Sequence, residues 1–134
     1  MAQKENNIIP MIFDEAFYRK MATQKWRQQD YKKAAEYYEK VLELSPKDFD
    51  IQQHYAQCLV KLNIGKKAER LFYENIVKDF HVAESFYELS QLNIELNEPN
   101  KAFLFGINYV ILSEDKDFRE ILEKTFEVAY TNEQ

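Results

Sequence analysis

Few residues in this chain could perform catalysis or bind a metal ion. His54 lies four residues before Cys58, so the two side chains would project from one face of a helix. A thiol beside an imidazole could act as a nucleophile with its base, or the pair could supply two metal ligands. A structural zinc ion needs about four ligands, whereas the chain has only one other histidine, His81, and no other cysteine. We therefore predict no metal site, with Cys58 buried between helices and His54 partly exposed.

Sequence patterns for phosphate, oxyanion or calcium chemistry are weak. The chain has two glycines, so it offers few backbone loops that could cradle a phosphate or an oxyanion. The stretch "NIGKKA" contains one of them, and "DKD" at 115–117 has too few ligands in series for a calcium loop. The sequence therefore predicts that the protein is not an enzyme and holds no cofactor.

Composition and charge narrow the class of protein further. Of 134 residues, 46% are hydrophobic and 15% aromatic, which is enough for a packed core. The net charge of −5 argues against a general nucleic-acid binder, because such proteins are usually basic. The apolar stretch at 7–13 contains a proline and is too short to span a membrane. With a single cysteine and no internal disulfide, we expect a cytoplasmic protein without a membrane partner.

A period of 34 residues runs through the chain. Small residues recur at this spacing in two series, Ala22, Ala56 and Ser90, and Ala34, Ala68 and Ala102. Tyr38 and Phe72 repeat an aromatic residue four positions after the alanine. A fixed period of this length is typical of stacked supersecondary units rather than of one globular core.

Each period predicts two helices. In the first period Asp14 can cap one helix, and a second helix is expected over 31–44, where Pro46 ends it. In the third period Pro99 suits the first turn of a helix, because its missing N–H is no loss there. A last amphipathic helix is expected over 117–130. That helix could close the apolar end of the stack, or it could begin a fourth unit.

These positions make the sequence resemble the tetratricopeptide repeat family, whose unit is a helix–turn–helix with a small residue, a later alanine and aromatic, and a late proline. The matching residues are Tyr18, Met21, Ala22, Ala34, Tyr38 and Pro46 in the first unit, Tyr55, Ala56, Ala68 and Phe72 in the second, and Phe86, Leu89, Ser90 and Ala102 in the third. Phe80 and Glu114 stand where the family has proline, and Gly106 replaces the aromatic residue.

The resemblance implies an all-α fold, a right-handed superhelical α–α solenoid. Its units would span 15–48, 49–82 and 83–116, followed by a capping helix at about 117–130. We expect one domain over 14–134 after a lead-in segment at 1–13. The small residues would let two helices approach closely, and we expect an aromatic residue (Phe103, Phe105 or Tyr109) to cross closely over Gly106.

The resemblance also implies a concave groove, lined by the first helix of each unit, in which members of the family hold peptides or partner helices. The residues at groove positions are Arg19, Lys20, Thr23, Trp26 and Arg27, then Gln53, His54, Gln57 and Lys61, then Glu84, Tyr87, Glu88, Gln91, Ile94 and Glu95, together with Ala16, Asp50 and Val60. Residues 15–48 carry eight basic and six acidic side chains, but residues 83–134 carry four and eleven. We predict a field along the groove that orients a partner and weakens with salt, although ordinary solvated faces would show a similar pattern.

One branch of the family grips the C-terminal carboxylate of heat-shock chaperones with a clamp of lysine, asparagine and arginine. The clamp positions fall on Arg19, Thr23, His54, Glu84 and Glu88 in this chain. Only Arg19 keeps the charge, and the two glutamates would repel an acidic tail. We therefore predict that the chain does not bind such tails.

The expected function is a non-catalytic module that binds a peptide or helix of a partner protein, as the N-terminal part of a longer bacterial repeat protein. One alternative is a small secretion-type chaperone, with an apolar groove and dimerisation through residues 7–17. Another is a self-associating structural module in which that segment or the last helix docks onto a second copy, so a homo-oligomer stays open. A simpler expectation for residues 8–13 is local packing on the first helix pair, as in a hydrophobic staple.

Overall fold

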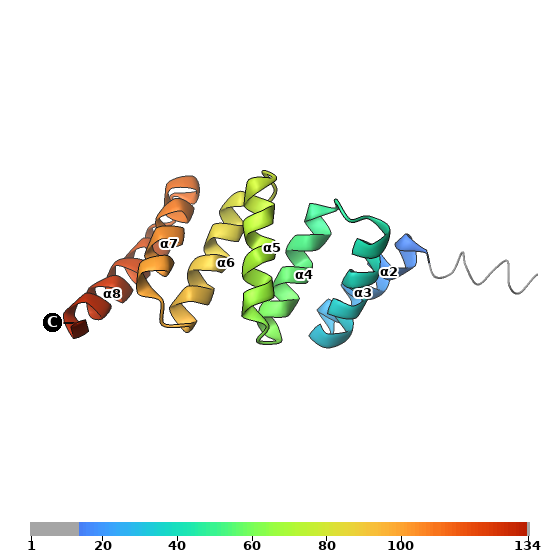
Figure 1. The fold of residues 1–134 in the computed structure, drawn as a ribbon, viewed down its shortest axis with the longest axis horizontal. Coiled ribbons are helices and arrows are strands. Elements are labelled where there is room, and N and C mark those ends of the chain that lie inside the picture. The colour runs from blue at the N-terminus through green and yellow to red at the C-terminus, as the bar shows by residue number, and fades with distance from the viewer. Residues whose placement is uncertain (1–13, 134) are drawn as a thin grey trace, which may run out of the picture. The chain divides into compact units, whose positions relative to one another are not determined.

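The computed structural model describes residues 14–133, with side chains described up to residue 127. This part of the chain is all-α and contains no strand. Its helices are α2 (Glu15–Arg27), α3 (Tyr31–Leu44), α4 (Phe49–Lys61), α5 (Gly65–Val77), α6 (Val82–Glu95), α7 (Pro99–Ser113) and α8 (Lys116–Glu133) (Figure 1). The expectations for the lead-in segment concern residues 1–13, which lie outside the described range.

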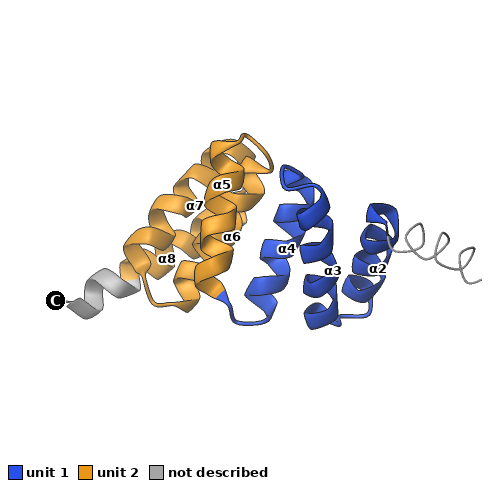
Figure 2. Cartoon of the chain, turned by 45° about the vertical axis from the view of Figure 1, so that its right-hand side comes forward, with its two compact units in different colours: residues 1–64 blue, residues 65–134 orange. Residues whose placement is uncertain are grey.

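The helices divide into two compact units, one up to Ile64 and one from Gly65 (Figure 2). In the first unit α2 packs against α3, and α3 against α4. In the second unit α5 packs against α6, α6 against α7, and α7 against α8. Within each unit a helix therefore packs on its neighbour in sequence, which is the arrangement of an α-solenoid.

Aspartate side chains begin four of the helices. Asp14, Asp30, Asp48 and Asp115 each accept a hydrogen bond from the backbone N–H three residues later, at 3.0, 3.2, 3.1 and 3.0 Å. Such caps satisfy one of the backbone donors that the first turn of a helix leaves without a partner. Pro99 is the first residue of α7, as the sequence predicts.

The turns that follow α2, α4 and α6 share one backbone geometry. Gln29, Asn63 and Asn97 have φ of 61°, 63° and 59°, in the left-handed region that often ends a helix. After each of them the next N–H donates back to a carbonyl five residues earlier, at 2.9, 2.8 and 2.8 Å. The 34-residue period of the sequence is therefore matched by a turn geometry that repeats at the same spacing.

The two series of small residues lie in the tightest parts of the fold. Ala22, Ala34, Ala56, Ala68, Ser90 and Ala102 are all 0% exposed. In the second unit the Ser90 hydroxyl donates to the Ala102 carbonyl at 2.7 Å, so α6 and α7 approach closely at this point. The prediction that small residues allow close helix packing is confirmed here.

Gly106 is buried, but the prediction that an aromatic residue crosses closely over it was wrong. A Cβ atom at this position would lie 2.5 Å from Cδ2 of Leu122 and 2.9 Å from Oγ of Ser90. The space above the glycine is therefore filled by an aliphatic side chain of α8 and a hydroxyl of α6. The aromatic residues of α7 point elsewhere, since Phe103 packs against Phe126 and Phe105 against Tyr73.

Candidate partner-binding faces

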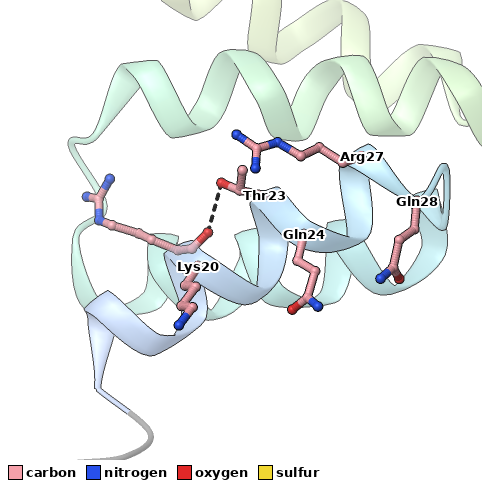
Figure 3. Close-up of a pocket in the computed structure, with 6 residues that line it drawn as sticks. Lys20, Thr23, Gln24, Arg27 and Gln28 are labelled. Carbon is pink, nitrogen blue, oxygen red and sulfur yellow. Dashed lines mark hydrogen bonds between the residues drawn. The ribbon is translucent and has the colours of Figure 1, made fainter.

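An open depression lies on α2 in the first unit. It has a volume of about 690 Å³, and the described residues that line it are Arg19, Lys20, Thr23, Gln24, Arg27 and Gln28. Because they recur at spacings of three and four residues, their side chains share one face of the helix (Figure 3). Four of them are residues that the sequence predicts for the groove.

Two cations of this face are free of ion pairs within residues 14–127. Lys20 and Arg27 are exposed, and neither forms an ion pair with another residue of that range. In Figure 3 the Lys20, Gln24 and Gln28 side chains form a row along the helix, and Thr23 and Arg27 lie beside it. The face therefore offers positive charge together with amide groups that can both donate and accept hydrogen bonds.

Arg19, by contrast, is held by two carboxylates. Its guanidinium donates to Glu15 at 3.0 Å from Nε and 2.5 Å from Nη2, and Nη2 also donates to Oδ2 of Asp48. Hydrogen bonds to Asp48 and Glu15 raise the pKa of Arg19, and the hydrogen bond from Arg19 lowers the pKa of Glu15. Arg19 thus joins α2 to the start of α4, and its charge is largely compensated before any partner arrives.

Asp48 has two roles that substitution can separate. It caps α4 through Oδ1 and pairs with Arg19 through Oδ2. We expect Asp48→Ala to lower the free energy of unfolding by about 1–2 kcal/mol, because both interactions are lost. Asp48→Asn keeps a capping oxygen and is expected to cost less than about 1 kcal/mol. Urea denaturation measures both, and equal losses for the two variants would contradict a capping role.

The same carboxylate makes stability depend on pH. Burial alone would raise the pKa of Asp48, but hydrogen bonds from Arg19 and from the backbone of Ile51 lower it below its usual value of 3.8. A lowered pKa in the folded state means that the stabilisation is complete above the unfolded pKa and is lost as the pH falls through the folded pKa. The difference in stability between wild type and Asp48→Asn should therefore be constant above about pH 4, shrink as the pH falls further, and vanish only below the lowered pKa of the folded state.

The α4 residues predicted for the groove differ in exposure. His54 is exposed and its ring stacks on Tyr38, with centroids 6.0 Å apart. Gln57 is half-buried, but Gln53 is only 3% exposed and offers little surface. His54 and Gln57 are thus the central residues of α4 that a partner could contact.

Tyr31, the first residue of α3, contacts residues near the C-terminal ends of both α2 and α4 in this unit. The ring of Trp26 packs on Tyr31 with centroids 5.2 Å apart, and Nζ of Lys61 lies 6.0 Å from the centre of the same Tyr31 ring. Three predicted groove residues at the C-terminal ends of their helices therefore lie near each other, since Arg27 follows Trp26 in sequence. This places one more cation beside the basic residues of α2.

In the second unit, two predicted groove residues belong to an aromatic cluster. The Tyr87 ring lies 5.0 Å from Tyr109 and 5.0 Å from Phe118, so α6, α7 and α8 meet there. Gln91 donates from Nε2 to the Tyr87 hydroxyl at 2.9 Å. Tyr109 donates from its hydroxyl to Asp115 at 2.8 Å. Tyr87 and Gln91 are therefore held in fixed positions.

The remaining predicted residues of α6 give this unit an acidic face. Glu84 and Glu95 are exposed, and Glu88 and Ile94 are half-buried. Oε2 of Glu84 lies 3.9 Å from Nδ1 of His81, so the two would attract each other only when the histidine is protonated.

Sequence reasoning missed two residues of the α2 depression, Gln24 and Gln28. Both extend the row that begins at Lys20 by steps of four residues, so helical periodicity alone could have found them.

Cys58 is not prepared for nucleophilic chemistry. Its thiol is 0% exposed, and burial raises the pKa to about 12. The thiolate is the nucleophilic form, and it is strongly disfavoured at neutral pH in such surroundings. The spacing of His54 and Cys58 therefore reflects helix packing more than chemistry.

Stacked helix pairs of this kind define an α-solenoid, a class of protein-interaction scaffold. The sequence model of the tetratricopeptide repeat family matches residues 25–72. Among solved structures the fold is similar to that of the MamA protein, with a TM-score of 0.74 and 19% sequence identity. That match covers 85% of this chain and 63% of the MamA chain. A search of curated protein sequences gave no significant match.

Residues 25–72 therefore match the tetratricopeptide repeat family, and the described helices form an α-solenoid. This family and this fold are typical of non-catalytic modules that bind other proteins. The number of units and their limits stay predictions. Among the described helices, none combines the length and the apolar character needed to cross a bilayer.

Proposed function

We propose that the chain binds an acidic peptide or helix of a partner protein on its basic face, which we define as Lys20, Thr23, Gln24, Arg27 and Gln28. The observation that carries this proposal is the depression of about 690 Å³ with two cations that no described residue neutralises. Positive charge in a hollow attracts carboxylates and speeds their approach.

The polar residues of the basic face suit a peptide backbone. Each glutamine amide has two N–H donors and an acceptor oxygen, so Gln24 and Gln28 can pair with backbone N–H and C=O groups of a bound segment. His54, Gln57, Trp26 and Lys61 extend the proposed surface within the same unit. Specificity would then come from the acidic side chains of the partner, and affinity would fall as salt rises.

The acidic face of the second unit, with Glu84 and Glu95 exposed, is proposed as a separate contact for basic residues of the same partner. Tyr87 and Gln91 support it because the aromatic cluster fixes their positions. Acidic tails of the heat-shock type remain unsuitable ligands for this second face, since two glutamates occupy the clamp positions.

The proposed role is non-catalytic, and the buried Cys58 supports it. A single thiol in the whole sequence also suits a reducing compartment, so we place the protein in the cytoplasm as a proposal. We also propose that this chain is the N-terminal part of a longer bacterial repeat protein.

Charge reversal on the basic face tests the proposal. Random peptides would first be selected on the wild-type protein, and the best binder titrated by fluorescence anisotropy. We expect enrichment in aspartate and glutamate, and we expect Lys20→Glu with Arg27→Glu to weaken binding by about tenfold or more. The matched control is Lys32→Glu with Lys33→Glu, which reverses two exposed charges on α3.

The control variant should bind like the wild type at each salt concentration. If both double variants lose affinity equally, net charge and not the basic face would explain the binding. Selection of peptides without acidic residues would contradict the proposal directly.

A further inference from the structure

Helix α6 of the second unit carries only negative charges, and they lie on one face of the helix. Its charged residues are Glu84, Glu88 and Glu95, and it contains no lysine or arginine. Glu95 is exposed and forms no ion pair with another residue of the range 14–127. This acidic face is opposite in sign to the basic face of α2, where Lys20 and Arg27 are likewise free of ion pairs within that range.

The charges on the two helices also have the same spacing. Lys20 and Arg27 are seven residues apart on α2, and Glu88 and Glu95 are seven residues apart on α6. Seven residues make almost two full turns, so each pair lies on one side of its helix with an axial separation of about 10.5 Å. Two such helices lying side by side can therefore bring both cations against both carboxylates. An extended strand fits less well, because side chains on one of its faces repeat at about 6.6 Å and then about 13 Å.

The glutamines of the two faces favour one relative direction of the helices. The antiparallel direction gives the pairs Lys20–Glu95, Gln24–Gln91 and Arg27–Glu88. The amide nitrogen of Gln91 donates to Tyr87, but its amide oxygen can still accept from the exposed amide of Gln24. The parallel direction would also match the charges, but it would place Gln24 against Leu92, which is 5% exposed and has no polar side chain. The antiparallel direction is therefore the better fit.

We propose that the acidic helix bound by the basic face is α6 of a second copy of this chain. This inference rests on the proposed function, because it names the partner of the same face. Charge complementarity supports a second copy, since one chain carries both the basic face and an acidic face that matches it in sign and in spacing. Because the two faces are different, each copy can contact one neighbour through its basic face and one through its acidic face.

Sedimentation equilibrium of the full chain at low salt tests this association. We expect an average mass above the 16.1 kDa of one chain, rising with protein concentration and falling as salt is added. Lys20→Glu and Glu95→Arg should each raise the dissociation constant by about tenfold or more, because each places like charges opposite one another. Both changes in one chain restore opposite charges between copies, so this combined variant should associate within about threefold of the wild type.

The matched control exchanges two exposed charges outside both faces, Lys32→Glu on α3 and Glu74→Arg on α5. Like the combined variant, the control pair leaves the net charge of −5 unchanged. Alone or together, the control changes should leave the dissociation constant at its wild-type value. Circular dichroism would show that every variant keeps its helical content.

The remaining outcomes separate this inference from the proposed function. A wild type that stays monomeric at every concentration but binds the selected acidic peptide would overturn the inference and leave the proposed function standing, whereas loss of both would overturn both. A combined variant weaker than either single variant would show that Lys20 and Glu95 do not meet. Excess acidic peptide should dissociate the wild type, because both ligands use the basic face, and association that persists would contradict the inference.

Discussion

Replacing Phe72 with alanine is expected to lower the free energy of unfolding by about 3–5 kcal/mol. Phe72 is 0% exposed and is the aromatic residue of its period on α5. Its removal forfeits the burial of a large ring and leaves a cavity that the surrounding helices fill only partly. Urea denaturation followed by circular dichroism measures the loss.

The matched control for Phe72→Ala is Val77→Ala on the same helix. Val77 is 79% exposed, so its truncation should change stability by less than about 0.5 kcal/mol. A loss below about 1 kcal/mol for Phe72→Ala would show that the repeated aromatic position is not a packing anchor of the second unit.

Gly106 should resist any side chain, and Gly106→Val is expected to cost about 1–3 kcal/mol. A Cβ atom there meets Leu122 at 2.5 Å and the Ser90 hydroxyl at 2.9 Å. Leu122 is only 2% exposed, so its side chain has little room to withdraw. Displacing Ser90 would also weaken its 2.7 Å hydrogen bond to Ala102. Chemical denaturation of the variant gives the cost.

A double-mutant cycle identifies the neighbour responsible. Leu122→Ala opens space beside Gly106, so Gly106→Val with Leu122→Ala should lose less stability than the sum of the single variants, by about 0.5–3 kcal/mol. Gly65→Ala is the mild control, because its Cβ would meet Leu92 at 3.1 Å, a tight but less severe contact. Strict additivity in the cycle would mean that Leu122 is not the obstacle.

Local signals in the sequence predicted the helices well. The range 31–44 is observed as α3, Asp14 caps α2, and Pro99 begins α7. These features depend on residues close together in the chain, where capping, proline geometry and apolar periodicity act directly. The packing role of the small residues in each period could also be predicted, because two helices that approach closely leave room for little more than alanine, serine or glycine.

Contacts between residues far apart in the sequence could not be predicted from such local signals. The sequence offered three aromatic neighbours for Gly106 because they are near it in the chain, but Leu122 comes from the following helix. Arg19 was predicted as a cation for the groove, and nothing in its spacing showed that Asp48, 29 residues later, would hold it. Such pairings depend on how helices pack and not on the pattern within one of them.

The candidate site was predicted only in outline. Family positions gave Lys20, Thr23 and Arg27, which line the observed depression, but they also gave Gln53, which is 3% exposed. The exposed apolar residues of α7, Leu104, Ile111 and Leu112, had no counterpart in the prediction, because an apolar helix in a sequence does not reveal how many of its faces neighbours will cover.

Nuclear magnetic resonance mapping of the selected acidic peptide on the labelled full chain tests the central claim most directly. The account predicts that backbone shifts concentrate at Lys20, Thr23, Gln24, Arg27 and Gln28, and that they shrink as salt is raised. Shifts confined to the second unit, or spread evenly over both units, would contradict it.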